Sequence, residues 1–416
     1  MSASTGRRPV ITGIGVVAPN GITTETFWKS TVEGISVLDR ITREGCEAMP
    51  LRVAGQVRDF DPASLIEERF LAQTDRFTHF ALAAAQAALA DARLSRTDYE
   101  NSPFNIGVVT AAGSGGGEFG QRELQRLWGP GPRSVGPYQS IAWFYAASTG
   151  QISIRGGFKG PCGVVASDEA GGLDALRHAA ATVMRGTDTM VVGAAEAPLA
   201  PYSVVCQLGY EGLSLREEPD RAYRPFTSSA CGFVPAEGGA FLLVEDERAA
   251  RRRGAPVRAE VAGHATTFTG EARWAASREG LAHAVRGALA EAHCAPEEID
   301  VVFADALGIP EADRAEALAL ADALGAHGTR VPVTAPKTGT GRAYCGGPVL
   351  DVAAAVLAME YGAVPPTPNV FDVCHDLDVV TGRARAAELR TALVLSRGLM
   401  GSNSALVVRH IADGTS

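Results

Sequence analysis

The segment VVASDEAGGLDAL, residues 164–176, joins a run of β-branched residues to a stretch with helical spacing. This order predicts a buried strand that turns into a helix near Gly171 and Gly172. Glu169 then stands at a strand-to-helix elbow, where a helix N-terminus stabilises an anion and where nucleophiles often sit. A carboxylate is a poorer acyl acceptor than a thiolate. The alternative that Asp168 and Glu169 only cap the helix therefore stays open.

On both sides of this segment, short apolar runs alternate with Ala-rich helical stretches, which predicts an α/β fold. The polar, basic segment 246–260 separates two comparable sets of elements, so we expect two halves, residues 1–250 and 251–416. Strands are predicted at 9–17, 105–112, 163–167, 189–196, 239–246, 258–265, 300–306, 331–335, 391–398 and 404–410. Helices are predicted at about 76–93, 171–185, 277–293, 312–325 and 348–361.

The charge and hydropathy of the sequence argue against nucleic-acid binding and against a membrane protein. The 416 residues include 38 Lys and Arg against 47 Asp and Glu, a net charge of −9, with no basic cluster to neutralise nucleic acid or an anionic membrane. No apolar stretch reaches the roughly 20 residues that span a bilayer. Arg7 and Arg8 precede the apolar run VITGIGVVA as in a twin-arginine signal, but Gly13, Gly15 and Pro19 interrupt the run. We interpret it as a strand and expect a soluble, cytoplasmic protein.

The cysteines indicate reduced thiols in a cytoplasm rather than disulfides or a metal site. They are odd in number and widely spaced, with no C-x-x-C pair and no histidine at ligand spacing. The seven are Cys46, Cys162, Cys206, Cys231, Cys294, Cys345 and Cys374.

The pattern Gly13-x-Gly15-x-x-Ala18 matches a dinucleotide-binding fingerprint in outline. A true fingerprint opens a helix whose N-terminus holds the pyrophosphate. Here Pro19-Asn20-Gly21 makes a turn first, so we do not expect nucleotide binding.

The elbow resembles the active-site turn T-A-C-S-S-G-L-D-A of the β-ketoacyl synthases in the thiolase superfamily. Glu169 stands at the position of the catalytic Cys, and the Gly-Leu-Asp-Ala tail is kept at 172–175. GIGVVAPNG (13–21), RPFTSSACGFVPAEGGA (224–240) and GLMGSNSAL (398–406) follow the family's other landmarks in order. The resemblance implies a five-layer αβαβα fold built from two duplicated halves.

The β-ketoacyl synthases also carry two histidines at positions where this chain has other residues. The first falls at Asp305, with Asp313 and Glu316 retained after it, and the second falls at Arg342, with Lys337 retained before it. Claisen condensation needs a thiolate to carry the acyl chain and imidazoles to assist decarboxylation. We therefore expect no catalytic site at Glu169, Asp305 and Arg342.

A ketosynthase scaffold without the catalytic residues resembles the chain length factors, which are the ketosynthase-β subunits of type II polyketide synthases. VFADALGIPEADRAEA (302–317), WFYAASTGQISI (143–154) and VPVTAPKTGTGR (331–342) are typical of that group. Its members usually carry Gln where this chain has Glu169, and an ionised Glu would repel an oxyanion. A malonyl decarboxylase role is therefore not expected here.

The resemblance implies a heterodimer with a ketosynthase-α, supplied by an acyl carrier protein with malonyl and polyketide chains, without cofactor or metal. A tunnel from the partner's Cys would run into this subunit, with gate positions at Gly117, Gly120 and Leu124. These positions are spaced i, i+3 and i+7 and share one helix face. Because two of them are glycines, we expect a deep tunnel and a long aromatic polyketide.

Two other function classes stay open. One is a stand-alone thiolase-like acyltransferase or malonyl decarboxylase that uses a non-standard residue such as Cys162, Cys231 or Cys345. The first two are expected to be buried structural thiols, the commoner state of a free Cys, whereas Cys345 follows the lost histidine and could face the pocket. The other class is a free-standing acyl-binding protein, which would be a monomer or homodimer.

Overall fold

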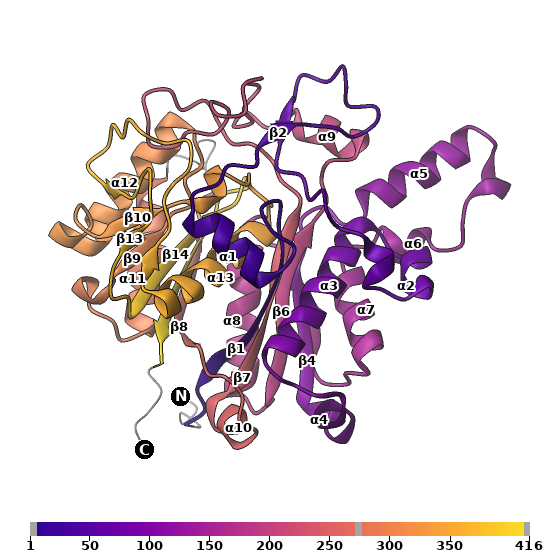
Figure 1. The fold of residues 1–416 in the computed structure, drawn as a ribbon, viewed down its shortest axis with the longest axis horizontal. Coiled ribbons are helices and arrows are strands. Elements are labelled where there is room, and N and C mark those ends of the chain that lie inside the picture. Colours follow the sequence, from indigo (N-terminus) through magenta and orange to yellow (C-terminus); the bar gives the residue numbers. More distant parts are fainter. Residues whose placement is uncertain (1–5, 271–276, 412–416) are drawn as a thin grey trace.

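A computed structural model describes residues 6–270 and 277–411, whose longer strands form one mixed 11-stranded sheet (Figure 1). The sheet order is β12-β10-β9-β14-β15-β8-β1-β7-β6-β4-β5. The strands are β1 Pro9–Val17, β4 Ile106–Ala111, β5 Cys162–Val165, β6 Thr189–Glu196, β7 Gly238–Asp246, β8 Ala259–Phe268, β9 Val301–Phe303, β10 Pro332–Thr334, β12 Asp378–Val379, β14 Thr391–Arg397 and β15 Ser402–His410. Two small pairs join β2 Asp39–Arg40 to β3 Val53–Ala54 and β11 Ala363–Val364 to β13 Arg385–Ala386.

The helices fill the connections between these strands. The longer ones are α1 Thr24–Val32, α3 Arg76–Asp91, α5 Gly117–Trp128, α7 Ala147–Gly156, α8 Gly171–Met184, α11 Arg278–Glu291, α12 Pro310–Leu324 and α13 Gly346–Tyr361. The shorter ones are α2 Glu68–Gln73, α4 Arg96–Asn101, α6 Gln139–Ala142, α9 Pro201–Gln207 and α10 Glu247–Arg252. All ten predicted strands and all five predicted helices are present, although β9 and β10 are only three residues long.

The sheet repeats one topology twice. From β1 outward the first half runs β1-β7-β6-β4-β5, and from β8 outward the second half runs β8-β15-β14-β9-β10. Counted outward from the inner strand of each half, the first two pairs of neighbouring strands are antiparallel and the next two pairs are parallel. The halves join where β1 pairs with β8. This repeat is the reason we propose a division of the chain near residue 250, between β7 and β8.

The layers follow from the alternation of side chains along the strands. Leu242 and Val244 of β7 point to a central core that contains α8 and α13, whereas Leu243 points to an outer core with α3 and α7. The outer face of the second half is covered by α11 and α12. The result is the predicted five-layer αβαβα order, with α8 and α13 as the middle layer, and the thiolase-like fold is confirmed.

Gly13 and Gly15 lie inside β1, where they permit close packing of a helix. A Cβ on Gly15 would lie 1.9 Å from the carbonyl oxygen of Ala84 in α3, and one on Gly13 would lie 2.1 Å from that of Ala88. Each contact is with helix backbone, which cannot move aside easily. The glycines are therefore explained by the approach of α3 to β1.

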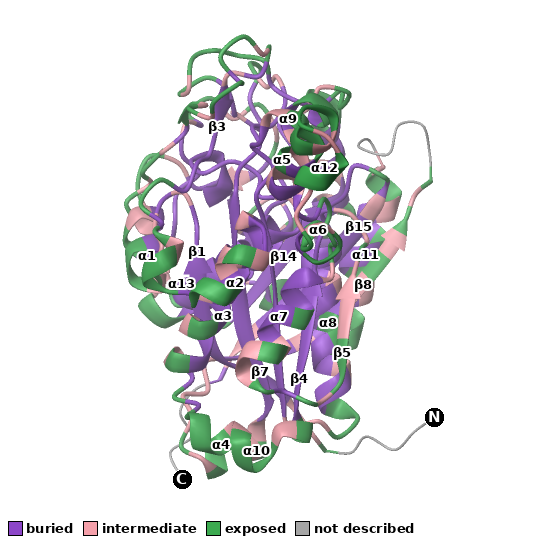
Figure 2. Cartoon of the chain, turned by 90° about the vertical axis from the view of Figure 1, so that its right-hand side faces the viewer, coloured by how far each residue is buried: buried purple, intermediate pink, exposed green. Residues whose placement is uncertain are grey.

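The strand β5 lies at the edge of the sheet and is half-exposed along most of its length. The prediction of a buried strand there is wrong for the single chain, because no strand within residues 6–270 and 277–411 pairs with the outer side of β5. Cys162 is exposed on it, so the prediction that this thiol is buried is also wrong. Figure 2 shows this side of the molecule, with β5, α8 and β8 in view.

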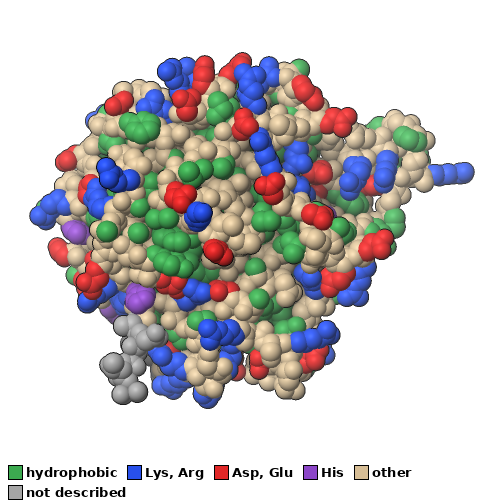
Figure 3. All heavy atoms as spheres, viewed as in Figure 1, with side chains coloured by type: hydrophobic (Ala, Val, Ile, Leu, Met, Phe, Trp, Pro, Cys, Tyr) green, Lys and Arg blue, Asp and Glu red, His purple; other side chains and the backbone are tan. Residues whose placement is uncertain are grey.

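The surface agrees with the charge argument from the sequence. Lys and Arg are interspersed with Asp and Glu over the face shown in Figure 3, with no continuous basic stripe there. Within residues 6–270 and 277–411, no helix combines the length and the apolar character needed to cross a bilayer.

We predict that Gly15→Ala lowers the free energy of unfolding by about 1–3 kcal/mol, because the new methyl group must push α3 away from β1. The matched control is Gly150→Ala in α7, where a Cβ meets no atom within 4 Å. That change should be neutral or stabilise by up to about 1 kcal/mol through helix propensity. Urea unfolding followed by circular dichroism measures both, and equal effects of the two substitutions would contradict the packing argument.

Candidate functional site

The predicted elbow after β5 has a strained backbone at Asp168. Asp168 adopts a positive φ of 59°, which costs energy in a residue other than glycine. Its carboxylate accepts a hydrogen bond from the backbone N–H of Met400 at 2.7 Å, and its carbonyl accepts one from Gly171 at 3.0 Å. The terminal turn at 398–401 therefore holds the elbow, and two predicted landmarks distant in sequence meet at one point.

Glu169 is buried at this elbow and is bound by Arg342. The Nε of Arg342 donates to Oε2 of Glu169 at 2.9 Å, and its Nη2 donates a second, short hydrogen bond to the same oxygen. Burial raises the pKa of Glu169 to about 7, although the positive charge of Arg342 opposes that rise. The carboxyl group is thus not the bare anion that the sequence suggested, because Arg342 compensates its charge when it ionises.

Arg342, at the second replaced histidine position, also binds Asp305, at the first. Its Nη2 lies 2.9 Å from Oδ1 of Asp305, and its Nη1 donates to the Asp305 carbonyl at 2.8 Å. Burial alone would raise the pKa of Asp305, but the charges of Arg342 and Arg397 outweigh it and hold that pKa below its usual range. Glu169, Asp305 and Arg342, the three positions that the resemblance aligns with a nucleophile and two imidazoles, are therefore joined into one ion-paired group.

Arg397 extends this network on the far side of Asp305. Its Nε donates to Oδ2 of Asp305 at 2.9 Å and its Nη2 donates to Oε2 of Glu316 at 2.9 Å. The sequence analysis did not assign Arg397 to the site. The available signal was a charged residue at the end of the otherwise apolar run TALVLSR.

The retained residues Lys337, Asp313 and Glu316 hold the loop around Asp305. Lys337 Nζ lies 2.6 Å from Oδ2 of Asp351 and donates to the Ala304 carbonyl at 2.8 Å. Glu316 accepts from the backbone N–H groups of Asp305 and Ala306, and Asp313 accepts from those of Phe226 and Gly308. These bonds leave Lys337 with a structural role, and we propose no catalytic role for it.

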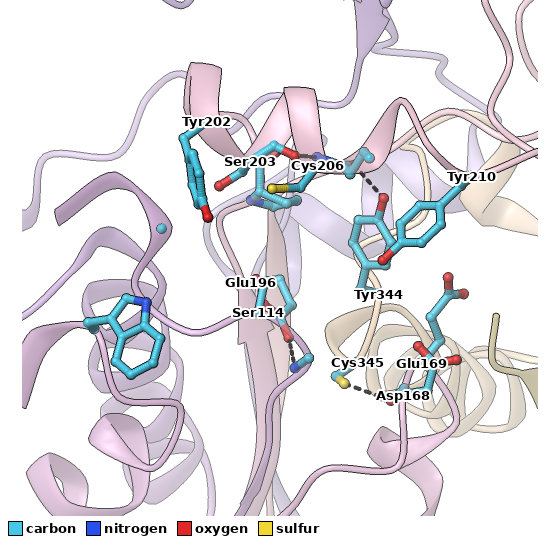
Figure 4. Close-up of a pocket in the computed structure, with 15 residues that line it drawn as sticks. Ser114, Asp168, Glu169, Glu196, Tyr202, Ser203, Cys206, Tyr210, Tyr344 and Cys345 are labelled. Atoms are coloured by element: carbon cyan, nitrogen blue, oxygen red, sulfur yellow. Dashed lines mark hydrogen bonds between the residues drawn. The ribbon is translucent and has the colours of Figure 1, made fainter. Parts of the chain in front are cut away.

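A pocket of about 190 Å³ leads from the elbow to the start of α5. In Figure 4 the side chains of Tyr202, Ser203 and Cys206 project from α9 on one side, and Asp168, Glu169 and Cys345 lie on another. Glu196 and Ser114 lie between these groups, where the Ser114 hydroxyl donates to Glu196 at 2.8 Å. The complete lining is Gly113, Ser114, Gly117, Trp143, Asp168, Glu169, Glu196, Pro198, Tyr202, Ser203, Cys206, Gln207, Tyr210, Tyr344 and Cys345.

The three gate positions differ in their surroundings. Gly117 lines the pocket, where a Cβ would lie 2.4 Å from the hydroxyl of Ser203. Gly120 is buried one turn further along α5 and does not line the pocket. Leu124 is exposed. The structure therefore brings one of the three positions to the pocket wall.

Family models and solved structures match nearly the whole chain. Residues 7–250 match the model described as "Beta-ketoacyl synthase, N-terminal domain", and residues 258–371 match "Beta-ketoacyl synthase, C-terminal domain". The chain belongs to the β-ketoacyl synthase family.

Individual relatives place the chain within this family. It is 74% identical over 404 residues to a Streptomyces coelicolor protein provisionally named polyketide beta-ketoacyl synthase 2, covering 97% of this chain and 95% of that protein. It is 50% identical over 406 residues to the tetracenomycin polyketide synthase ketoacyl synthase beta subunit of Streptomyces glaucescens, covering 96% and 98%. A structure titled as the ishigamide ketosynthase/chain length factor matches with a TM-score of 0.88 and 27% identity, covering 98% of this chain and 100% of that one. The resemblance to ketosynthase-β subunits is confirmed.

Of the cysteines offered as other nucleophiles, Cys345 does not have the surroundings that a reactive thiolate needs. Cys345 lies in the pocket wall, but burial beside Glu196 raises the pKa of its thiol well above the usual range, and its Sγ donates to the Asp168 carbonyl at 2.9 Å. Cys231 is half-buried rather than buried, 3.4 Å from the hydroxyl of Ser214. Among the residues of the two described ranges, no group of His, Cys, Asp and Glu is arranged to hold a metal ion.

We predict that Arg342→Ala lowers the free energy of unfolding by about 3–5 kcal/mol, because Glu169 and Asp305 lose the buried charge that faces both of them. The control is Arg390→Ala, which removes an exposed partner of Glu388 and should leave stability unchanged. Chemical denaturation of the two variants measures the difference. A loss no larger in Arg342→Ala than in Arg390→Ala would show that the network does not stabilise the elbow.

Proposed function

We propose that this chain is the non-catalytic chain length factor of a type II polyketide synthase, paired with a ketosynthase-α that performs the condensation. One observation carries the proposal: Arg342 pairs with Glu169 and Asp305 where condensing relatives hold their catalytic groups, while a pocket still leads from that elbow to α5. The chemistry is absent and the space for an acyl chain is kept. This combination suits a subunit that shapes a product made elsewhere.

The replaced groups cannot support a Claisen condensation. The side chain at the nucleophile position is a carboxyl group bound to a guanidinium. It offers no thiolate that could accept an acyl chain. An aspartate and an arginine bound to each other cannot supply the neutral imidazoles that assist decarboxylation and stabilise the enolate oxygen.

The exposed edge of β5 supports the proposed heterodimer. A sheet edge with unpaired N–H and C=O groups is a template for pairing with another chain. Exposed aromatic residues surround the pocket on the same chain, among them Trp143, Phe144, Tyr145 and Tyr202, and such residues are enriched at protein interfaces. Helix α5, which projects from the body in Figure 1, offers further surface to a partner.

The substrate follows from the partner's chemistry. We propose that an acyl carrier protein delivers malonyl units to the ketosynthase-α and that the growing poly-β-ketone enters the pocket of this chain. Gly117 adds no side chain of its own to the pocket wall, and the hydroxyl of Ser203 lies 2.4 Å from its Cβ position. On the absence of a bulky residue at position 117 we propose a long aromatic backbone. The seven unpaired cysteines suit a reducing cytoplasm, where we place the complex.

We predict that the chain alone condenses nothing and that the pair releases a polyketone of one length class from malonyl-loaded carrier protein. Glu169→Cys should leave the isolated chain inactive, because Asp305 and Arg342 still occupy the imidazole positions. Mass spectrometry of released products measures this, with the copurified heterodimer as the positive sample and a partner lacking its nucleophile as the negative one. Condensation by the isolated chain would overturn the proposal.

We predict that Gly117→Phe shortens the released polyketone. The phenyl ring cannot pass Ser203, which lies 2.4 Å from the Cβ position, without entering the pocket between α5 and α9. Leu124→Phe is the matched control, because Leu124 is exposed and outside the pocket lining, and its products should keep the native length. Unchanged length in a Gly117→Phe complex that still assembles would place the wall elsewhere.

A further inference from the structure

The space left by Gly120 is already occupied by another side chain. A Cβ at Gly120 would lie 3.0 Å from Cδ1 and 3.8 Å from Nε1 of Trp143. The indole edge of Trp143 therefore packs directly on the α5 backbone. A glycine at this position makes room for an aromatic ring that comes from outside the helix.

The backbone that carries Trp143 is clamped by the glycines before α5. The N–H of Gly116 donates to the Trp143 carbonyl at 3.0 Å. A Cβ at Gly115 would lie 2.6 Å from the same oxygen, and one at Gly116 would lie 2.1 Å from the carbonyl oxygen of Ala142. A side chain at either position would clash with this backbone, so Gly115 and Gly116 fix where the backbone of Trp143 lies.

Trp143 lines the pocket together with Gly117 and Ser203, whereas Gly120 and Leu124 do not. We infer that Trp143, which follows α6, is the length-determining wall of the pocket on the α5 side. This inference rests on the proposed function and adds to it a specificity-determining residue outside the gate helix. The part of the poly-β-ketone that contacts Trp143 is its distal end, which is made first.

The indole suits this role because it is large and has only two rotatable side-chain bonds, so it is ordered at a small entropic cost. The contact with Gly120 blocks its movement toward α5. About half of Trp143 is exposed in the single chain, but on the α5 side a growing chain that reaches the ring meets a surface backed by helix backbone.

The test uses the reconstituted heterodimer with carrier protein and compares product lengths by mass spectrometry. Trp143→Ala should shift products to backbones at least one two-carbon unit longer, and Trp143→Phe should give a smaller shift in the same direction. Trp128→Ala, at the exposed end of α5 outside the pocket lining, is the control and should keep the native length. If Trp143→Ala fails to assemble, Trp143→Phe decides the outcome.

A double substitution tests whether Gly120 and Trp143 share one volume. Gly120→Phe introduced into Trp143→Ala should fill the space that the indole leaves and return the product length toward the native value. Native length in every Trp143 variant that assembles would overturn the inference, while the wild-type complex would still test the proposed function. Products without a defined length from the wild-type complex would instead overturn the proposed function.

Discussion

The guanidinium of Arg342 joins the three positions at which this chain departs from the condensing members of its family. It bonds to Glu169 on the helix α8 elbow and to Asp305 after β9, and Asp305 is in turn bonded to Arg397. A buried ion left without its partner costs several kcal/mol, so each of these residues depends on the others. The replacements are therefore a set, in which a single return to the catalytic residue would leave a charge uncompensated.

The loops around Asp305 are held by contacts that do not involve Glu169 or Arg342. The carboxylates of Asp313 and Glu316 still receive backbone N–H groups from the loops around them, and Lys337 still bonds to the Ala304 carbonyl. These contacts hold the loops whether or not a histidine stands at position 305. The pocket lies beside this ion-paired group, and Glu169 belongs to both.

The fold was largely predictable because local patterns carry it. The strands and helices follow from hydrophobic period and from Gly-rich turns, and the duplicated topology agrees with two comparable sets of elements. Glu169, Asp305 and Arg342 could be singled out because a resemblance aligned them with known catalytic positions. The sequence offered no way to see that they bond to one another, since their separation along the chain exceeds 30 residues in every pair. Arg397 was missed for the same reason, and the burial of β5 was wrong because an edge strand has the same local pattern as a central one.

The glycines near α5 show most clearly what could not be predicted from the sequence. In the sequence, Gly117 and Gly120 both indicate empty space on one helix face. In the structure, only Gly117 faces the pocket, and the volume beside Gly120 belongs to Trp143. A glycine can therefore leave space for substrate, or it can leave space that an aromatic ring from another segment fills. Only the tertiary packing distinguishes these two cases. It follows that the capacity of such a pocket depends jointly on α5 and on residues 142–145, because bulk lost from one segment is replaced by the other within the same close-packed volume.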